Sequence, residues 1–120
     1  MFVIDNEQAI LDGMQALEAQ WSCEFQLFLS VVQAEAFQRE NSAPPNVIIC
    51  DYRLADDITG SDAIKRLRTL YDSDIPAILI SGDADSALVS EARLNDFYLL
   101  HKPIQANKLR AIVGIAANDS

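Results

Sequence analysis

Val47-Ile48-Ile49-Cys50-Asp51 is the stretch that decides the fold, because a run of apolar residues ends there at a carboxylate. Similar apolar runs are Phe2-Val3-Ile4, Ala77-Ile78-Leu79-Ile80 and Phe97-Tyr98-Leu99-Leu100. A short run that is apolar on both sides of the pleat is typical of a strand in a parallel sheet covered by helices on both faces. Residues 23–29 alternate apolar and polar side chains instead, which predicts one further, less buried strand.

The segments between these strands have the apolar periodicity of helices. The periodic residues are Ile10, Met14, Leu17 and Trp21 in the first segment, Ala63, Leu67 and Leu70 in a middle one, and Leu109, Ile112, Val113 and Ala116 in the last. Two further helices are expected over residues 31–39 and about 85–93. Strands and helices therefore alternate along the whole chain.

This alternation predicts an α/β fold, a doubly wound sheet of parallel strands joined by right-handed crossovers. Five strands in a chain of 120 residues favour the flavodoxin-like (βα)5 arrangement with strand order 2-1-3-4-5, although periodicity alone does not fix that order. A chain of this length is expected to form a single domain over residues 1–120.

The composition limits the classes of function. A formal net charge of −9 argues against a nucleic-acid partner, because binding a phosphate backbone requires clustered Lys and Arg. No apolar stretch reaches the roughly 18 residues that a spanning helix needs, and no signal peptide is recognisable, so no membrane contact is expected. Cys23 and Cys50 lie in apolar stretches without metal-binding spacing, which favours buried thiols in a reducing, cytoplasmic setting.

Polar side chains follow four of the predicted strands. Asp5 and Asn6 follow the first strand, and Asp51, Ser81 and Lys102 follow the third, fourth and fifth. Because the carboxyl ends of parallel strands share one edge of the sheet, we expect these side chains to meet there. The sequence therefore predicts a ligand site at this edge.

The residue types at this edge suit phosphoryl transfer. Asp5 and Asp51 repel each other unless a cation joins them, and Mg²⁺ typically takes one or two carboxylates while it keeps several waters. The amide oxygen of Asn6 and a backbone carbonyl in the loop after Asp51 would complete the metal site. Asp51 would then act as a nucleophile on a phosphoryl group, with Lys102 and the Ser81 hydroxyl contacting the transferred oxygens.

Each of these residues also has an ordinary structural interpretation. The two polar residues after the first strand would serve as helix caps, and Asp51 would be a solvated carboxylate at a strand end. Lys102 would be a surface lysine. Ser81 would cap the helix that follows it, although Asp83 is the better-placed candidate for that cap. The hypothesis of a site depends on the conjunction of these residues and on no single one.

The sequence resembles a response-regulator receiver domain over nearly its whole length. Four segments, in the correct order and spacing, carry the resemblance: Val3-Ile4-Asp5-Asn6-Glu7, Val47-Ile48-Ile49-Cys50-Asp51-Tyr52-Arg53-Leu54, Ile78-Leu79-Ile80-Ser81-Gly82 and His101-Lys102-Pro103-Ile104. The resemblance implies that Asp51 takes a phosphoryl group from phosphohistidine with Mg²⁺, or alternatively Mn²⁺. It also implies a metal pocket of Asp5, position 6, Asp51 and the backbone carbonyl of Arg53, with Ser81 and Lys102 as switch and phosphate contacts.

The segments 4–7, 50–54 and 99–103 are further similar to receivers at the C-terminal end of hybrid sensor histidine kinases. The implied partner is a histidine kinase or a histidine phosphotransfer domain. A receiver catalyses its own phosphorylation and dephosphorylation, and a hybrid parent protein would also be a histidine kinase. A free-standing receiver has the same core motifs, so both contexts stay open.

Two positions depart from the family pattern. Asn6 stands where a second acid is usual, which removes one formal charge from the metal pocket. Leu99 stands where an aromatic switch residue is expected, so the usual coupling to the surface of the fourth and fifth strands is expected to be muted. Both departures support an alternative, a pseudo-receiver that acts as a protein-interaction module without phosphorylation.

A flavodoxin-like cofactor binder or small hydrolase fits less well, because the segment after the first strand is acidic and would repel a bound phosphate.

Overall fold

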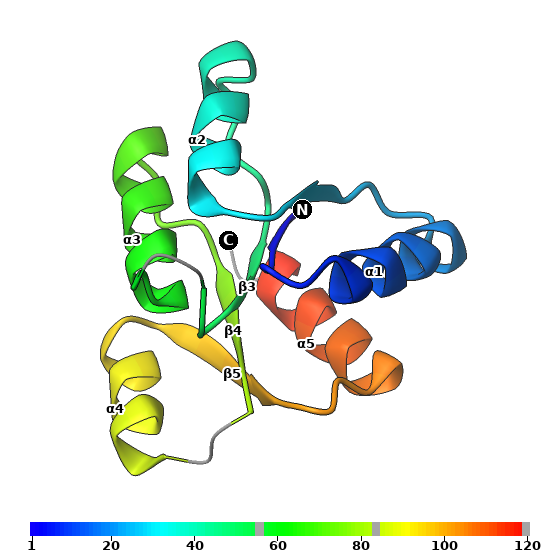
Figure 1. Ribbon diagram of the computed structural model, residues 1–120, viewed down its shortest axis with the longest axis vertical. Coiled ribbons are helices and arrows are strands. Elements are labelled where there is room, and N and C mark those ends of the chain that lie inside the picture. The colour runs from blue at the N-terminus through cyan, green and yellow to red at the C-terminus, as the bar shows by residue number, and fades with distance from the viewer. Residues whose placement is uncertain (55–56, 83–84, 119–120) are drawn as a thin grey trace.

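A parallel sheet lies between two layers of helices in the computed structural model, which describes residues 1–54, 57–82 and 85–118 (Figure 1). The strands are β1 (Phe2–Ile4), β2 (Gln26–Phe28), β3 (Ile48–Asp51), β4 (Ala77–Ser81) and β5 (Phe97–His101). The helices are α1 (Gln8–Trp21), α2 (Val31–Glu40), α3 (Gly60–Tyr71), α4 (Ser86–Leu94) and α5 (Ala106–Asn118).

The strand order is β2-β1-β3-β4-β5, and every neighbouring pair is parallel. This confirms the predicted flavodoxin-like α/β fold and its strand order. The register places Cys50 opposite Leu79 and Leu79 opposite Leu99, so these three side chains lie in one row across the sheet.

Helices α2, α3 and α4 cover one face of the sheet, and α1 and α5 cover the other (Figure 1). The side chains of β3 alternate between two buried clusters, with Ile48 and Cys50 on the side of α2, α3 and α4, and Ile49 on the side of α1 and α5. Because both faces are buried, the central strands are apolar at nearly every position.

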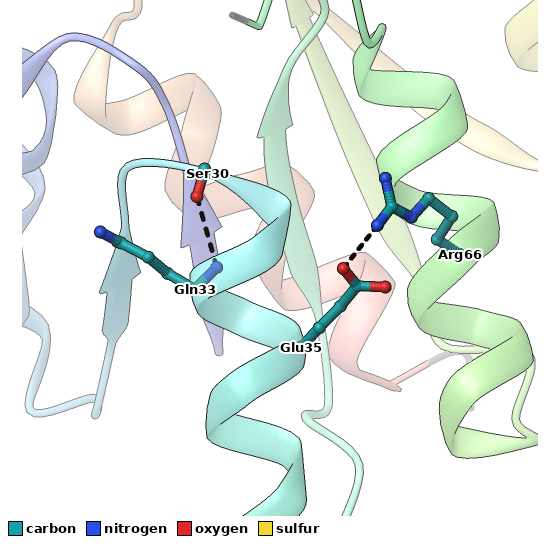
Figure 2. Close-up of polar contacts among 4 residues, drawn as sticks. All are labelled: Ser30, Gln33, Glu35 and Arg66. Carbon is teal, nitrogen blue, oxygen red and sulfur yellow. Dashed lines mark hydrogen bonds and ion pairs between the residues drawn. The ribbon is translucent and has the colours of Figure 1, made fainter. Parts of the chain in front are cut away.

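Three helices begin at side chains that accept a hydrogen bond from a free backbone N–H of the first turn. Ser30 accepts from the N–H of Gln33 in α2 (Figure 2), Thr59 caps α3, and Asp85 caps α4. The sequence had favoured Asp83 as the cap of α4. Asp83 lies outside the described residues, and the helix begins after Asp85, whose carboxylate accepts from the N–H of Ala87.

Helices α2 and α3 are also joined at their exposed surfaces. Arg66 donates to the carboxylate of Glu35 at 2.6 Å, across a pair of helices that Figure 2 shows side by side. Both side chains are partly exposed, so this ion pair contributes little to stability.

The second strand is shorter than predicted. The alternating pattern covered residues 23–29, but β2 contains only Gln26–Phe28. Strand β2 lies at the edge of the sheet and pairs with β1, which itself has three residues. Phe25 is nevertheless buried in the cluster beneath α1 and α5. An apolar residue of the alternating pattern is therefore buried as predicted, although it lies outside the strand.

The predicted helical faces are rotated slightly from the observed ones. In α1 the most buried residues are Leu11 and Met14, whereas Ile10 is only half-buried. In α3 the buried arc is centred between Ala63 and Ile64, so Leu70 falls at its margin and is 42% exposed. No helix among the described residues combines the length and the apolar character that crossing a membrane requires.

Candidate functional site

The predicted site residues lie at the carboxyl edge of the sheet, as the topology requires. Asp51 is the last residue of β3 and Ser81 the last of β4, while Asp5 and Lys102 directly follow β1 and β5. The N–H of Asp5 bonds to the carbonyl of Phe28 at 3.1 Å, and the N–H of Lys102 bonds to that of Ser81 at 2.8 Å. These ladder-like bonds fix where both side chains leave the sheet.

Asp51 and Lys102 form the central contact of the site. The Lys102 ammonium donates to the Asp51 carboxylate at 3.1 Å, with Asp51 nearly buried and Lys102 partly exposed. Burial raises the pKa of Asp51, and the hydrogen bond from Lys102 opposes this rise without cancelling it. Burial alone would lower the pKa of Lys102, but the bond to Asp51 and the negative charges of Asp51 and Asp5 outweigh it and raise that pKa. The ammonium therefore stays charged beside the carboxylate.

Asp5 is the second buried acid of the site, with 2% of its surface exposed. Its Oδ1 accepts a hydrogen bond from the N–H of Glu7 at 2.9 Å, which fixes the carboxylate at the start of α1. Burial raises the pKa of Asp5 to about 6; the bond from Glu7 opposes the rise and the charge of Asp51 adds to it. Asp51 is thus close enough to disfavour the ionisation of Asp5.

The carboxylate oxygens of Asp5 and Asp51 are suitable ligands for a hard divalent cation. No group of three His, Cys, Asp or Glu side chains among the described residues could hold a metal ion. Mg²⁺ does not require such a group, because it typically takes one or two carboxylates and keeps several waters. Asp5 and Asp51 are two carboxylates, and a cation would relieve the repulsion between them. The positive charge of Lys102 balances one of these two negative charges.

The other predicted residues lie around this centre with different exposure. Ser81 is 3% exposed and ends β4 next to β5. Asn6 is exposed at the rim, and Arg53 is exposed in the loop after Asp51, where it forms an isolated antiparallel bridge with Thr59. His101 is exposed at the end of β5. The structure therefore brings Asp51 and Lys102 into contact and places Asp5 near enough for both charges to affect its ionisation, with the other predicted residues around them.

Gly60 is a site residue that the sequence reasoning missed. It is the first residue of α3, and its N–H bonds to the carbonyl of Tyr52 at 2.7 Å. A Cβ at this position would collide with the backbone carbonyl oxygen of Asp51 and lie 2.7 Å from Leu79 Cδ1. Helix α3 thus packs directly on the peptide of Asp51. The segment Thr59-Gly60-Ser61 is typical of a turn before a helix, but it does not indicate this contact.

Tyr52 is the second residue that was missed. Its N–H bonds to the carbonyl of Ile80 at 2.8 Å, and its half-buried ring packs against the cluster that includes Leu88 of α4. Burial raises the pKa of the phenol, and the negative charge of Glu91 adds to the rise. Leu99 packs against the same cluster.

The remaining chemically active groups lie away from the site. Cys50 is buried next to Asp51, and burial raises its pKa far above the usual range, so the thiol stays neutral. A surface cavity of about 530 Å³ lies at the opposite edge of the sheet, where Pro76 and Phe97 mark the amino ends of β4 and β5. Because it lies at this opposite edge, the cavity has no part in the chemistry at Asp51. Its lining includes Arg68, whose guanidinium donates to two backbone carbonyls.

Comparison with known proteins gives one family. The family model of the response regulator receiver domain matches residues 1–114. No curated protein matches the sequence.

Solved structures of receivers superpose on this chain closely. A receiver domain protein from Clostridium thermocellum has a TM-score of 0.84 at 23% identity, covering 98% of this chain and 93% of its own. The receiver domain of NtrX from Brucella abortus has a TM-score of 0.84 at 20% identity, covering 99% and 98%. A CheY-like receiver domain protein from Methanospirillum hungatei JF-1 has a TM-score of 0.83 at 18% identity, covering 98% and 92%. At such identities the likeness shows the fold alone.

Proposed function

This chain belongs to the family of response regulator receiver domains of two-component signalling, and we propose that it accepts a phosphoryl group from phosphohistidine onto Asp51. The donor would be a histidine kinase or a histidine phosphotransfer domain. The receiver would catalyse both the gain and the later hydrolysis of its own phosphoryl group.

The contact between Asp51 and Lys102 carries this proposal. A nearly buried carboxylate at the end of a central strand lies 3.1 Å from an ammonium, with the buried Asp5 beside them. Such a carboxylate is positioned as a nucleophile, and the ammonium is positioned to contact an oxygen of the incoming group. A structural ion pair would not need a second buried acid next to it.

The bonds would change in one displacement. An Asp51 oxygen forms the new bond to phosphorus, while the bond from phosphorus to the imidazole nitrogen breaks and its electron pair stays on the imidazole. The product is an aspartyl phosphate, and the imidazole leaves in its neutral form because its other ring nitrogen already carries a proton. Lys102 and the Ser81 hydroxyl would contact the transferred oxygens, since phosphoryl transfer depends mainly on positioning and charge stabilisation.

A divalent cation would be held by Asp5, Asn6, Asp51 and the backbone carbonyl of Arg53. Mg²⁺ is the proposed ion and Mn²⁺ the alternative. When bound, it would supply positive charge to the transferred oxygens and relieve the repulsion between the two acids. The neutral amide of Asn6 makes this pocket one charge poorer than the usual family pocket.

We propose further that the domain is the receiver of a hybrid sensor histidine kinase and acts in the cytoplasm. The segments 4–7, 50–54 and 99–103 support the hybrid context through their resemblance to such receivers. Cys23 and Cys50 are both free, which supports a reducing compartment.

The direct experiment uses phosphoramidate, whose bond from phosphorus to nitrogen resembles that of phosphohistidine. The protein is incubated with it in Mg²⁺ or in EDTA and weighed intact by mass spectrometry. We expect a gain of one phosphoryl group in Mg²⁺ and little or none in EDTA. The Asp51→Asn variant should gain none, and Asp12→Asn, which changes an exposed carboxylate of α1, should behave as the wild type.

The pseudo-receiver is the competing function, and Asn6 and Leu99 are the observations that favour it. If neither phosphoramidate nor a phosphorylated histidine phosphotransfer domain loads the protein, the chain is a pseudo-receiver. An Asn6→Asp variant that gains phosphorylation under the same conditions would then identify the missing charge as the cause.

A further inference from the structure

The backbone of the acceptor residue rests on the first residue of α3. A Cβ at Gly60 would collide with the carbonyl oxygen of Asp51 and would lie 3.0 Å from the carbonyl carbon of the same residue. The thiol of Cys50 donates to this oxygen at 3.4 Å, so two residues contact it. Glycine permits such a close approach because it has no side chain. The position of the Asp51 peptide therefore depends on the glycine at position 60.

Helix α3 is anchored along its length. Ala63, Ile64 and Leu67 have no exposed surface and pack in the cluster on this face of the sheet. Arg68 donates to two backbone carbonyls, one before β4 and one after α4. The hydroxyl of Thr59 accepts from a backbone N–H of the first turn at 3.2 Å. The helix is therefore a fixed support for the peptide that its first residue contacts.

The end of β3 is held less completely than α3. Its pairing with β1 ends at Ile4 and Cys50, whereas its pairing with β4 continues to Asp51 and Ile80. The next N–H, that of Tyr52, also bonds to the carbonyl of Ile80, at 2.8 Å. The peptide of Asp51 is thus bound to β4 on one side and rests against the start of α3. If the two backbones are forced apart, the end of β3 is the part that should move.

The same contact reaches the loop after the acceptor. The N–H of Gly60 donates to the carbonyl of Tyr52 at 2.7 Å. The next residue, Arg53, forms an antiparallel bridge with Thr59, directly before the helix. The backbone carbonyl of Arg53 is one of the proposed metal ligands. Its position therefore depends on the start of α3 as well.

We propose that Gly60 is a positioning residue for the acceptor, which holds the Asp51 carboxylate beside Lys102 and the Arg53 carbonyl at the metal pocket. The inference rests on the proposed function, because this alignment matters for chemistry only if Asp51 takes the phosphoryl group. Gly60 itself touches neither the metal nor the transferred group. A small displacement of the acceptor is enough to impair the reaction, since phosphoryl transfer depends on alignment.

The geometric test compares crystal structures of the metal-free wild type and Gly60→Ala. The contact between Asp51 and Lys102 is 3.1 Å in the wild type. In the variant we expect it to lengthen beyond the roughly 3.5 Å reach of a hydrogen bond, because the end of β3 moves and α3 does not. An α3 that moves away while the contact of Asp51 with Lys102 is unchanged would overturn the inference.

A second substitution separates positioning from packing. The new Cβ would also lie 2.7 Å from Leu79 Cδ1, and Leu79→Val removes this atom. The losses of stability from Gly60→Ala and Leu79→Val should therefore be less than additive in urea unfolding. The lengthened contact of Asp51 with Lys102 should nevertheless persist in the double variant, because the collision with the Asp51 carbonyl remains. A contact restored to the wild-type distance would assign the effect to Leu79 and refute the role of Gly60.

Binding of Mg²⁺ measures the same positioning in solution. By titration calorimetry at constant ionic strength, we expect Gly60→Ala to bind Mg²⁺ about 10-fold more weakly than the wild type. Gly13→Ala is the control, because a Cβ there meets nothing within 4 Å, and it should bind as the wild type does. Trimethylamine N-oxide is added to all proteins if Gly60→Ala is not fully folded, because this osmolyte favours the compact state.

The outcomes distinguish this inference from the proposed function. Equal affinity of the wild type and Gly60→Ala for Mg²⁺ would contradict the positioning role alone. A wild type that binds no Mg²⁺ would count against the proposed metal site instead. The crystallographic comparison would then still decide the role of Gly60, because it is made without metal.

Discussion

The candidate site contains a cluster of three charged residues, Asp5, Asp51 and Lys102. Burial and ion pairing have opposite effects on the pKa values of its two acids. Burial raises the pKa of both acids, and Lys102 is the ammonium that opposes the rise at Asp51. Two carboxylates beside one ammonium leave an excess of negative charge. A cation at this place would therefore stabilise the folded chain as well as serve the chemistry.

Replacing Asp5 by Asn should stabilise the metal-free protein at neutral pH. The pKa of Asp5 rises from 3.8 to about 6 on folding, so the native state holds a proton that the unfolded state has released between these values. The free energy of unfolding therefore falls as pH increases through this window, and it stays low above pH 6. We expect Asp5→Asn to add on the order of 1–2 kcal/mol at pH 7.5.

Urea unfolding in EDTA at a series of pH values measures this effect. The advantage of Asp5→Asn should shrink as pH decreases from 6 to 4, because native Asp5 takes up its proton over this range and the cost of burying its charge disappears. Asn can still accept the bond from the N–H of Glu7, so the local geometry is retained. A gain that does not vary with pH would contradict the assignment to ionisation of Asp5.

Substitution of Gly60 by Ala should destabilise the fold at the acceptor. The new Cβ would meet the carbonyl of Asp51 and the side chain of Leu79, and overpacking of this kind costs about 1–3 kcal/mol. Gly13 is the matched control, since it lies within α1 and a Cβ there meets nothing within 4 Å. Gly13→Ala should stabilise by about 0.5–1 kcal/mol. Opposite signs in urea unfolding are expected, and a neutral Gly60→Ala would refute the tight contact.

The main site residues could be predicted from the sequence, whereas Gly60 and Tyr52 could not. Asp51, Ser81 and Lys102 each follow an apolar run, and parallel topology places such positions at one edge. The contact of Gly60 with Asp51 and the packing of the Tyr52 ring depend on how closely the covering helices approach the end of β3. No local pattern contains that distance, so only the folded chain shows it.

Among the elements, α3 is joined to the start of β4 and the end of α4 by one side chain. Arg68 donates to the carbonyl of Ile75 and to that of Asn95, both at 2.9 Å. Its guanidinium lies 4.9 Å from the centre of the Phe97 ring. These contacts fix the amino edge of the sheet, opposite the candidate site.

Replacement of Arg68 by Met should therefore destabilise the protein by about 1–3 kcal/mol, because two backbone carbonyls lose their donor. Arg66 lies on the same helix but pairs with Glu35 at the surface. Arg66→Met should cost no more than about 1 kcal/mol. Urea unfolding compares the two variants, and equal losses would show that the buried contacts of Arg68 are unimportant.

Element boundaries were predicted best where local signals decide them. The helices expected over 31–39 and 85–93 are Val31–Glu40 and Ser86–Leu94, each within one residue at either end. Strand β2 was predicted too long, because its length is limited by pairing with β1. Pairing joins residues distant in sequence, and the alternating pattern contains no information about it.

For the whole molecule, the alternation of strands and helices predicted a doubly wound parallel sheet, and the number of strands favoured the order 2-1-3-4-5 that the structure confirms. The net charge of −9 also belongs to the whole molecule. Any added salt screens the repulsion among these negative charges and so changes the free energy of unfolding. A specific metal effect must therefore be distinguished from screening.

Mg²⁺ should raise the free energy of unfolding of the wild type by about 1.4 kcal/mol for each tenfold increase in free ion above its dissociation constant. Asp51→Asn and Asp5→Asn should each lose most of this increase, because each removes a charged ligand. Thermal unfolding at constant ionic strength, balanced with Na⁺, measures the difference. An equal increase in all three proteins would indicate screening and no site.

The most direct test of the central claim is to locate the modified residue. The protein is loaded from phosphoramidate in Mg²⁺, treated with borohydride, which reduces an aspartyl phosphate to homoserine, and digested for peptide mass spectrometry. Homoserine at position 51, absent without the phosphodonor, is the expected result. Homoserine at Asp5 or at a surface aspartate, with position 51 unchanged, would contradict the role of Asp51 as the phosphoacceptor.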